Sequence, residues 1–277
     1  MQYWDYHTHS SLCNHAIGTI EDYITSAIEK NLAEIGISDH FPMDLLPEHF
    51  HIYAMPLNEF PSYISEIKRL QAKYISQIKV KIASEVDFFP TAFNGYKRII
   101  KPFLDDFDYI IGSVHAVPWQ GIEAIPIDEV QAIPMIKELG VDRVYLEYYD
   151  TLLEMIKTNF YNIVGHFDLP KKYGLFPQDS DKIWQKILQV LDQIENSGMA
   201  VEINTSGLYK NVKQTYPKED IIKELIQRKI PITLGSDAHS PKYIGFKFQE
   251  IIVRIKKWGL TSLCQFSSYE NNLIPLD

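Results

Sequence analysis

The sequence predicts an α/β fold: a single domain over residues 1–277 in which parallel strands close into a barrel surrounded by helices. Seven short apolar or alternating segments take turns with longer segments of helical period, as in repeated βα units. Neither a GxGxxG nor a GxxxxGK[ST] motif occurs, which weakens the alternative of an open nucleotide-binding sheet. A length of 277 residues fits one barrel, for which ~250 residues is common. An eighth regular strand is not evident.

Each predicted strand is a short apolar or alternating run bounded by polar or turn-forming residues. In the third run, Ile78, Val80 and Ile82 share one face, while the lysines between them point the other way. The predicted strands cover residues 3–7, 33–38, 78–86, 109–114, 162–165, 200–204 and 231–235.

The segments between the strands carry helix start and stop signals. Thr19 and Asp22 have the spacing of a capping box at the start of the first helix. Ser180 begins an amphipathic run that Gly198 ends, and a further helix is predicted over residues 219–228. No repeat, low-complexity tract or linker divides the chain, so no domain boundary is predicted.

Composition and charge exclude several classes of protein. Hydrophobic residues make up 45% and charged residues 23%, which excludes a disordered chain. A net charge of −9 argues against long nucleic acid or an anionic membrane as a partner. No signal-peptide pattern and no long apolar run is present, so a cytoplasmic protein is expected. Cys13 and Cys264 form no CxxC pair, and we expect Cys13 to be an inert buried residue.

Metal-type ligands follow six of the seven predicted strands. In a βα barrel the carboxyl ends of the strands meet at one rim, where active sites form. Unpaired imidazoles and carboxylates gathered there are costly to bury, and bound metal ions remove that cost. A ligand set of nitrogen and oxygen atoms suits Zn, Mn or Fe. The residues, in chain order, are His7, His9, His40, Glu85, His115, His166, Asp237 and His239.

Three other polar segments are harder to assign from the residues alone. The sixth strand is followed by the tripeptide at 204–206, Asn-Thr-Ser, in place of a metal ligand. His15 lies in a loop, and its spacing leaves open whether it is a ligand. His49 and His51 lie in the long irregular segment 41–57, and we expect them to belong to the surface or to a lid.

Seven stretches of the sequence carry a resemblance to a known family. They are DYHTHSSLCNH, EIGISDH, ASEVDFF, DYIIGSVHAV, NIVGHFDL, EINTSG and LGSDAH, and they extend from residue 5 to residue 239. Together they resemble the polymerase-and-histidinol-phosphatase (PHP) family, and within it the histidinol-phosphate phosphatase branch. The resemblance implies a distorted (β/α)₇ TIM-like barrel and a site for three divalent metal ions.

The resemblance also implies which residues hold each ion. It assigns the first ion to His7, His9, Glu85 and Asp237. Glu85 would bridge to the second ion, held also by His115 and His166, and the third would bind His15, His40 and His239. His15 thereby becomes an expected ligand.

The expected chemistry is direct hydrolysis of a phosphomonoester. A hydroxide between two ions would attack phosphorus, with Glu85 holding both ions. Asp237 is the candidate to handle the proton of the nucleophile, and His239 is the candidate to protonate the leaving alkoxide. Three divalent ions would make the pocket cationic although the whole chain is acidic.

The sequence departs from the branch where phosphate is held. Members of the branch commonly have arginine at the positions that here carry Lys171 and Tyr209. Lysine binds phosphate as a point charge and lacks the bidentate guanidinium fork. The candidate substrate contacts are Lys171, Lys210 and Ser206.

The leading hypothesis is a metal-dependent hydrolase of L-histidinol phosphate, which acts in histidine biosynthesis. An alternative enzyme keeps the chemistry and acts on another small phosphomonoester or on a nucleotide. A third alternative is a metal-binding module without catalysis. The expected partner is a small phosphorylated substrate, with no long nucleic acid and no membrane, and the oligomeric state is left open.

Overall fold

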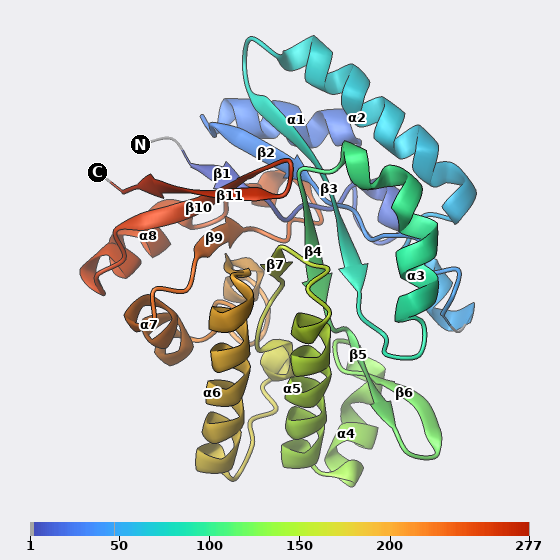
Figure 1. The fold of residues 1–277 in the computed structure, drawn as a ribbon, viewed down its shortest axis with the longest axis vertical. Coiled ribbons are helices and arrows are strands. Elements are labelled where there is room, and N and C mark those ends of the chain that lie inside the picture. Colours follow the sequence, from blue (N-terminus) through green and yellow to red (C-terminus); the bar gives the residue numbers. More distant parts are fainter. Residues whose placement is uncertain (1–2, 47, 277) are drawn as a thin grey trace.

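The predicted barrel is present in a computed structural model that describes residues 3–46 and 48–276. Seven parallel strands form one sheet in the order β1-β2-β3-β4-β7-β8-β9 (Figure 1). Each predicted strand corresponds to one of them. Their bounds are β1 Trp4–Asp5, β2 Glu34–Ile37, β3 Lys79–Asp87, β4 Tyr109–Ser113, β7 Ile163–Val164, β8 Ala200–Asn204 and β9 Ile232–Gly235. Residues 1, 2, 47 and 277 of the predicted domain lie outside the described residues.

The last strand returns to the first, so that the sheet is a nearly closed barrel. The Tyr6 amide donates to the Leu234 carbonyl at 3.2 Å, and the His9 amide donates to the Ala238 carbonyl at 3.0 Å. Inside the barrel, the Tyr109 hydroxyl donates to the Tyr6 carbonyl across the sheet, at 2.6 Å. Gly36 leaves the room for that hydroxyl, since a Cβ at this position would lie 1.7 Å from it.

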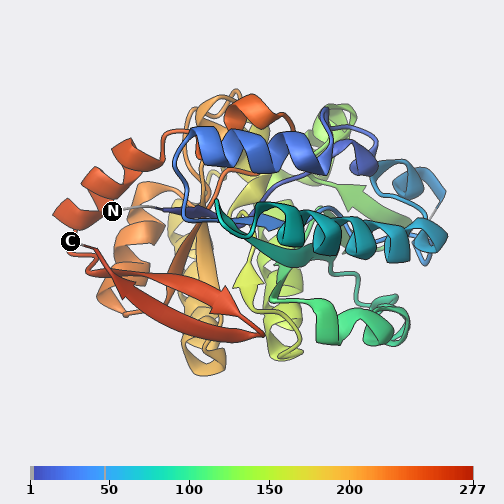
Figure 2. The ribbon, with the colours of Figure 1, turned by 90° about the horizontal axis from the view of Figure 1, so that it is seen from above.

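Helices surround the sheet, as the view from above shows (Figure 2). The capping box predicted at Thr19 and Asp22 starts the first helix, and Gly198 ends the sixth with a φ of 73°. The α-helices are α1 Ile20–Glu29, α2 Phe60–Tyr74, α3 Phe93–Ile100, α4 Ile133–Leu139, α5 Val141–Lys157, α6 Ser180–Ser197, α7 Glu219–Gln227 and α8 Phe248–Lys257. Short 3₁₀ helices cover Ser11–Cys13, Glu48–Tyr53, Leu57–Glu59, Lys101–Asp106, Val130–Ala132, Leu169–Tyr173, Ser206–Leu208 and Pro241–Tyr243. Within the described ranges, no helix is long and apolar enough to cross a membrane.

Two antiparallel hairpins, which the sequence did not predict, extend the barrel. The first joins β5 (Ala116–Trp119) to β6 (Ile122–Pro126), directly after β4. The second joins β10 (Ser262–Ser267) to β11 (Glu270–Pro275), close to the start of β1 (Figure 1).

The second hairpin covers the amino-terminal end of the barrel with aromatic rings. The Phe266 ring lies 6.2 Å from that of Tyr6 and 5.7 Å from that of Tyr109, and all three side chains are buried. The indole N–H of Trp4 donates to the Cys264 carbonyl at 3.1 Å. This layer forms a floor of the barrel at the end opposite to the carboxyl ends of its strands.

Candidate metal centre

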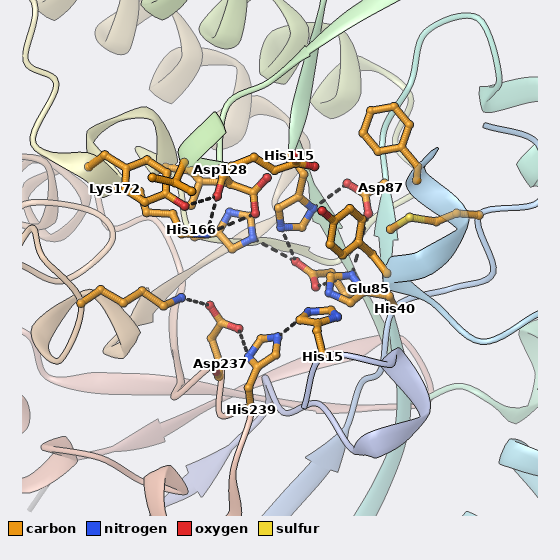
Figure 3. Close-up of a pocket in the computed structure, with 18 of the residues that line it drawn as sticks. His15, His40, Glu85, Asp87, His115, Asp128, His166, Lys172, Asp237 and His239 are labelled. Atoms are coloured by element: carbon orange, nitrogen blue, oxygen red, sulfur yellow. Dashed lines mark hydrogen bonds and ion pairs between the residues drawn. The ribbon is translucent and has the colours of Figure 1, made fainter. Parts of the chain in front are cut away.

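The predicted ligands meet at the carboxyl ends of the strands, around a cavity of about 470 Å³ (Figure 3). Apart from His15, which comes from a loop, they follow six of the strands or, for Glu85, lie near the end of one, so parallel strands bring together residues that are far apart in the sequence. The ligand candidates that line the cavity are His15, His40, Glu85, His115, His166, Asp237 and His239. His7 and His9 lie beneath them and are fully buried.

Glu85 lies at the centre of two ligand groups. Its Oε2 atom is 3.3 Å from Nε2 of His7 and 3.3 Å from Nε2 of His9. Its Oε1 atom is 2.9 Å from Nε2 of His166 and 3.7 Å from Nε2 of His115. Oε2 also lies 3.0 Å from Nδ1 of His40, which belongs to the third group below. The two carboxylate oxygens thus face different sets of imidazoles, which is the arrangement that lets one carboxylate bridge two ions.

A third group consists of His15, His40 and His239, whose ligand atoms lie within 4.8 Å of one another. Nε2 of His15 and Nε2 of His239 are 2.9 Å apart. The His239 ring also stacks on that of His9, with centroids 4.4 Å apart. The stacking brings the third group next to the first.

Several buried ligand atoms have no hydrogen-bond partner among the described residues. Leaving such atoms unpaired costs free energy, and a cation that they coordinate removes the cost. Imidazole and carboxylate donors without thiolate suit Zn, Mn or Fe. The residues present therefore fit a multi-metal centre. The buried ligand atoms without a hydrogen-bond partner among the described residues are Nε2 of His7, both ring nitrogens of His9, Nδ1 of His40, Oε2 of Glu85 and Nδ1 of His166.

The electrostatic environment keeps part of the set in the protonation state that metals require. Burial and neighbouring histidines hold the pKa of His9 well below its usual value. Burial lowers the pKa of His40 to about 3 and that of His239 to about 4. Burial alone would raise the pKa of Glu85, but the imidazoles of His7 and its neighbours hold it well below the usual range. His7 and His115 differ: burial alone would lower their pKa values, but Glu202 raises that of His7 well above its usual value and Asp87 raises that of His115 to about 10. A metal ion therefore has to displace a proton from each of these two rings.

Two carboxylates that were not predicted orient the ligands. The two carboxylate oxygens of Glu202, on β8, lie 3.0 and 2.9 Å from Nδ1 of His7. One of them also accepts a hydrogen bond from the backbone amide of His166, at 2.7 Å. Asp87, on β3, lies 2.6 Å from Nδ1 of His115. The role of Asp87 could have been predicted from the alternation of side chains along the strand, because Asp87 is two residues from Glu85 and points to the same face.

Asp237 is held by three side chains that turn its carboxylate toward the ligands. Its Oδ2 atom accepts from the Ser206 hydroxyl at 3.0 Å and from the Asn204 amide at 3.3 Å, and lies 3.5 Å from Nζ of Lys210. Its Oδ1 atom is 3.5 Å from Nε2 of His9. Lys210 lines the cavity, whereas Ser206 is fully buried behind Asp237 and serves to hold it.

Lys171, a predicted substrate contact, does not lie on the wall of the ligand cavity in the structure. Its ammonium is buried, donates to the Thr215 carbonyl at 2.6 Å and lies 2.8 Å from Oδ2 of Asp168. It does not line the cavity of the ligands, because the turn after β7 directs it between the helices. The adjacent Lys172 does line this cavity. Tyr209, the other position where arginine was expected, stacks on Tyr243 with ring centroids 4.1 Å apart.

Comparison with known proteins agrees with this geometry. The model of the PHP domain matches residues 5–206. The chain belongs to the PHP family. It is 32% identical to a probable histidinol-phosphatase of Deinococcus radiodurans, over 92% of this chain and 93% of that protein. It is 30% identical to the histidinol-phosphatase of Bacillus subtilis, over 92% of this chain and 100% of that protein.

A solved structure shares the fold of this PHP chain. The histidinol phosphate phosphatase of Lactococcus lactis, complexed with zinc, L-histidinol and phosphate, has a TM-score of 0.77. The match covers 98% of this chain and 99% of that one, at 24% sequence identity. At this identity the likeness establishes the barrel fold.

The remaining candidates of the PHP chain lie at the margin of the site. Cys13 is buried close to His9 and His239, and burial raises the pKa of its thiol to about 12. His49 is exposed, and Nε2 of His51 lies 2.8 Å from the Leu46 carbonyl. Neither of these two histidines lines the cavity. Their segment contributes aromatic rings to the wall in their place, those of Phe50 and Tyr53.

Proposed function

We propose that the chain is a metal-dependent phosphomonoesterase that hydrolyses L-histidinol phosphate to L-histidinol and phosphate in histidine biosynthesis. The observation that carries the proposal is Glu85, whose two oxygens face different sets of imidazoles next to a third histidine group in one cavity. The names of the relatives, histidinol-phosphatase at 30% identity and more, support the substrate. A biosynthetic role of this kind favours the cytoplasm as its location.

The proposed ligand sets follow the three groups in the structure. His7, His9, Glu85 and Asp237 would hold one ion, Glu85, His115 and His166 a second, and His15, His40 and His239 a third. The zinc complex of the Lactococcus lactis protein supports zinc, and the donors also suit Mn and Fe. When bound, the ions supply an acidified water as the nucleophile and positive charge for the phosphoryl oxygens.

The protein's own residues hold the substrate and move its protons. Asp237, fixed by Ser206 and Asn204, is the candidate to accept the proton of the nucleophile at its Oδ1 atom. His239, on the cavity wall, is the candidate to protonate the departing alkoxide. Lys210 and Lys172 line the same cavity and would attract the phosphate as point charges.

A second candidate keeps the chemistry and changes the ester. It is favoured by Tyr209, which stacks on Tyr243 where the branch commonly has a phosphate-binding arginine. Without a guanidinium fork, phosphate would be held by ions and lysines, and these do not distinguish one alcohol from another. Another small phosphomonoester or a nucleotide is therefore the alternative substrate.

The test is phosphate release from a panel of phosphomonoesters that includes L-histidinol phosphate. The protein is loaded with Zn, Mn or Fe, and its metal content is measured in the same preparation. We expect the largest kcat/KM for L-histidinol phosphate. A fully metallated protein that releases phosphate from other esters and leaves L-histidinol phosphate intact would establish the alternative.

A further inference from the structure

We propose that Glu129, supported by Asp128, forms a subsite for a cationic nitrogen of the substrate and makes the cavity selective for phosphate esters of amino alcohols. The inference rests on the proposed function and adds to it the group that the enzyme recognises. Both residues lie between β6 and the 3₁₀ helix Val130–Ala132, just after the hairpin that the sequence did not predict, and both line the cavity.

The first argument is the charge of the cavity wall. Apart from the proposed ligands and Asp87, the wall carries two carboxylates, Asp128 and Glu129, and two ammonium groups, Lys172 and Lys210. A cavity that serves only to bind an anionic phosphate ester gains nothing from extra carboxylates, which repel it. Carboxylates are favourable there when the same substrate also carries a positive group.

Asp128 is already paired and fixes the position of its neighbour. Lys172 donates to the Asp128 carbonyl at 2.7 Å and lies 3.2 Å from its Oδ2 atom (Figure 3). The Tyr173 hydroxyl donates to the same carbonyl at 2.6 Å. These contacts hold the segment after β6 against the residues that follow His166.

Glu129, unlike Asp128, forms no ion pair with a cationic side chain among the described residues. Lys172 pairs with Asp128, and among the described residues no lysine, arginine or histidine forms an ion pair with Glu129. Its partner is the hydroxyl of Tyr53, and burial together with Glu129 raises the pKa of that hydroxyl to about 12. One hydroxyl occupies only part of the acceptor capacity of a carboxylate. The half-buried Glu129 therefore retains a charge and free lone pairs on the cavity wall.

The surroundings of Glu129 fit the rest of an amino alcohol that carries a ring. Tyr53 and Phe50 come from the segment before α2, and Tyr173 comes from the turn after β7. Aromatic faces pack against planar rings and attract cations. With the phosphate at the ligands, the ammonium of L-histidinol phosphate would face Glu129.

The experiment compares Glu129→Gln with a matched control, Glu138→Gln, which makes the same change at an exposed position of α4. The metal-loaded enzymes hydrolyse L-histidinol phosphate and p-nitrophenyl phosphate, which has no amine. We expect Glu129→Gln to lower the preference for the amine-bearing ester about 10-fold or more, through KM, since it removes a charge-assisted contact. Glu138→Gln keeps the preference of the wild-type enzyme. Tyr53→Phe, which leaves the charge of Glu129 in place, has a smaller effect than Glu129→Gln.

A binding measurement separates this inference from the proposed function. Calorimetric titration with L-histidinol, which has the amine and lacks the phosphate, is expected to show binding that Glu129→Gln weakens about 10-fold or more. If wild type binds L-histidinol in this way but does not hydrolyse its phosphate ester, the proposed function fails and the subsite stands. Absence of L-histidinol binding, or a variant that loses activity equally on both esters, overturns the subsite.

Discussion

Asp87 and His115 form a carboxylate–imidazole pair in which Oδ1 of Asp87 lies 2.6 Å from Nδ1 of His115, while Nε2 of His115 faces Glu85 at 3.7 Å. The pairing fixes which nitrogen of the ring carries the proton and which is free to bind a metal ion. Glu202 has the same relationship to His7. Two of the proposed ligands are thus oriented by carboxylates: Asp87 lies on the strand next to the one that His115 follows, and Glu202 lies on β8, two strands from β1 in the barrel.

Asp87→Asn is therefore expected to weaken metal binding without removing a ligand. Loss of an orienting carboxylate typically costs about 10- to 100-fold in metal affinity. Competition with a chelator, followed by metal analysis, measures the effect. Asp105→Asn, at an exposed position, is the matched control and should retain the affinity of the wild type. Equal affinities in the two variants would mean that Asp87 does not orient His115.

His15→Ala tests the third ligand group separately from the other two. His15 is exposed and comes from a loop, so its removal should leave the barrel folded. We expect the metal content to fall by about one equivalent, because His40 and His239 alone provide too few ligands for a stable site. Circular dichroism checks the fold. An unchanged metal content would remove His15 from the proposed set.

Lys171 and Lys210 should behave differently although both were candidate substrate contacts. Lys171→Met breaks a buried pair with Asp168, in which both side chains are nearly inaccessible, and is expected to cost about 3–5 kcal/mol of unfolding free energy. Lys210→Met removes a cation from the cavity wall and is expected to lower kcat/KM about 10-fold or more, with little change in stability. Denaturant titration and steady-state kinetics of both variants check this. A Lys171→Met protein that is stable and has a raised KM would restore the original assignment.

Removal of the metals is expected to destabilise the protein. Buried nitrogens such as Nε2 of His7 and Nε2 of His9 then have no partner, and the stabilisation from metal binding is lost. Thermal unfolding with and without a chelator should show a fall in Tm that added Zn or Mn reverses. Identical curves in metal-analysed samples would show that the ligand groups do not contribute to stability.

The barrel could be predicted from the sequence because each strand is an apolar run between polar turns. The strand predicted at residues 78–86 is observed as β3, Lys79–Asp87, so each end is within one residue. The strand predicted at residues 200–204 is observed as β8, Ala200–Asn204. The two hairpins were missed. The apolar residues of β10 pack on the end of the barrel, and the pattern of residues along the chain does not reveal that long-range contact.

The ligand candidates could be placed at one rim because parallel strands bring their carboxyl ends together. The residues that orient them could not, since the roles of Asp87 and Glu202 depend on which side chains face each other inside the closed barrel. The direction of the Lys171 side chain could not be predicted for a related reason. Spacing from His166 places the residue in the turn but does not determine the side to which its ammonium points.

The aromatic floor of Tyr6, Tyr109 and Phe266 has a kinetic consequence. Because this layer is buried beneath the ligands, substrate enters and both products leave through the open rim. Phosphate, held at the deep end by the ions, would depart only after the alcohol has vacated the passage. That order of release would make inorganic phosphate a competitive product inhibitor and L-histidinol a noncompetitive one.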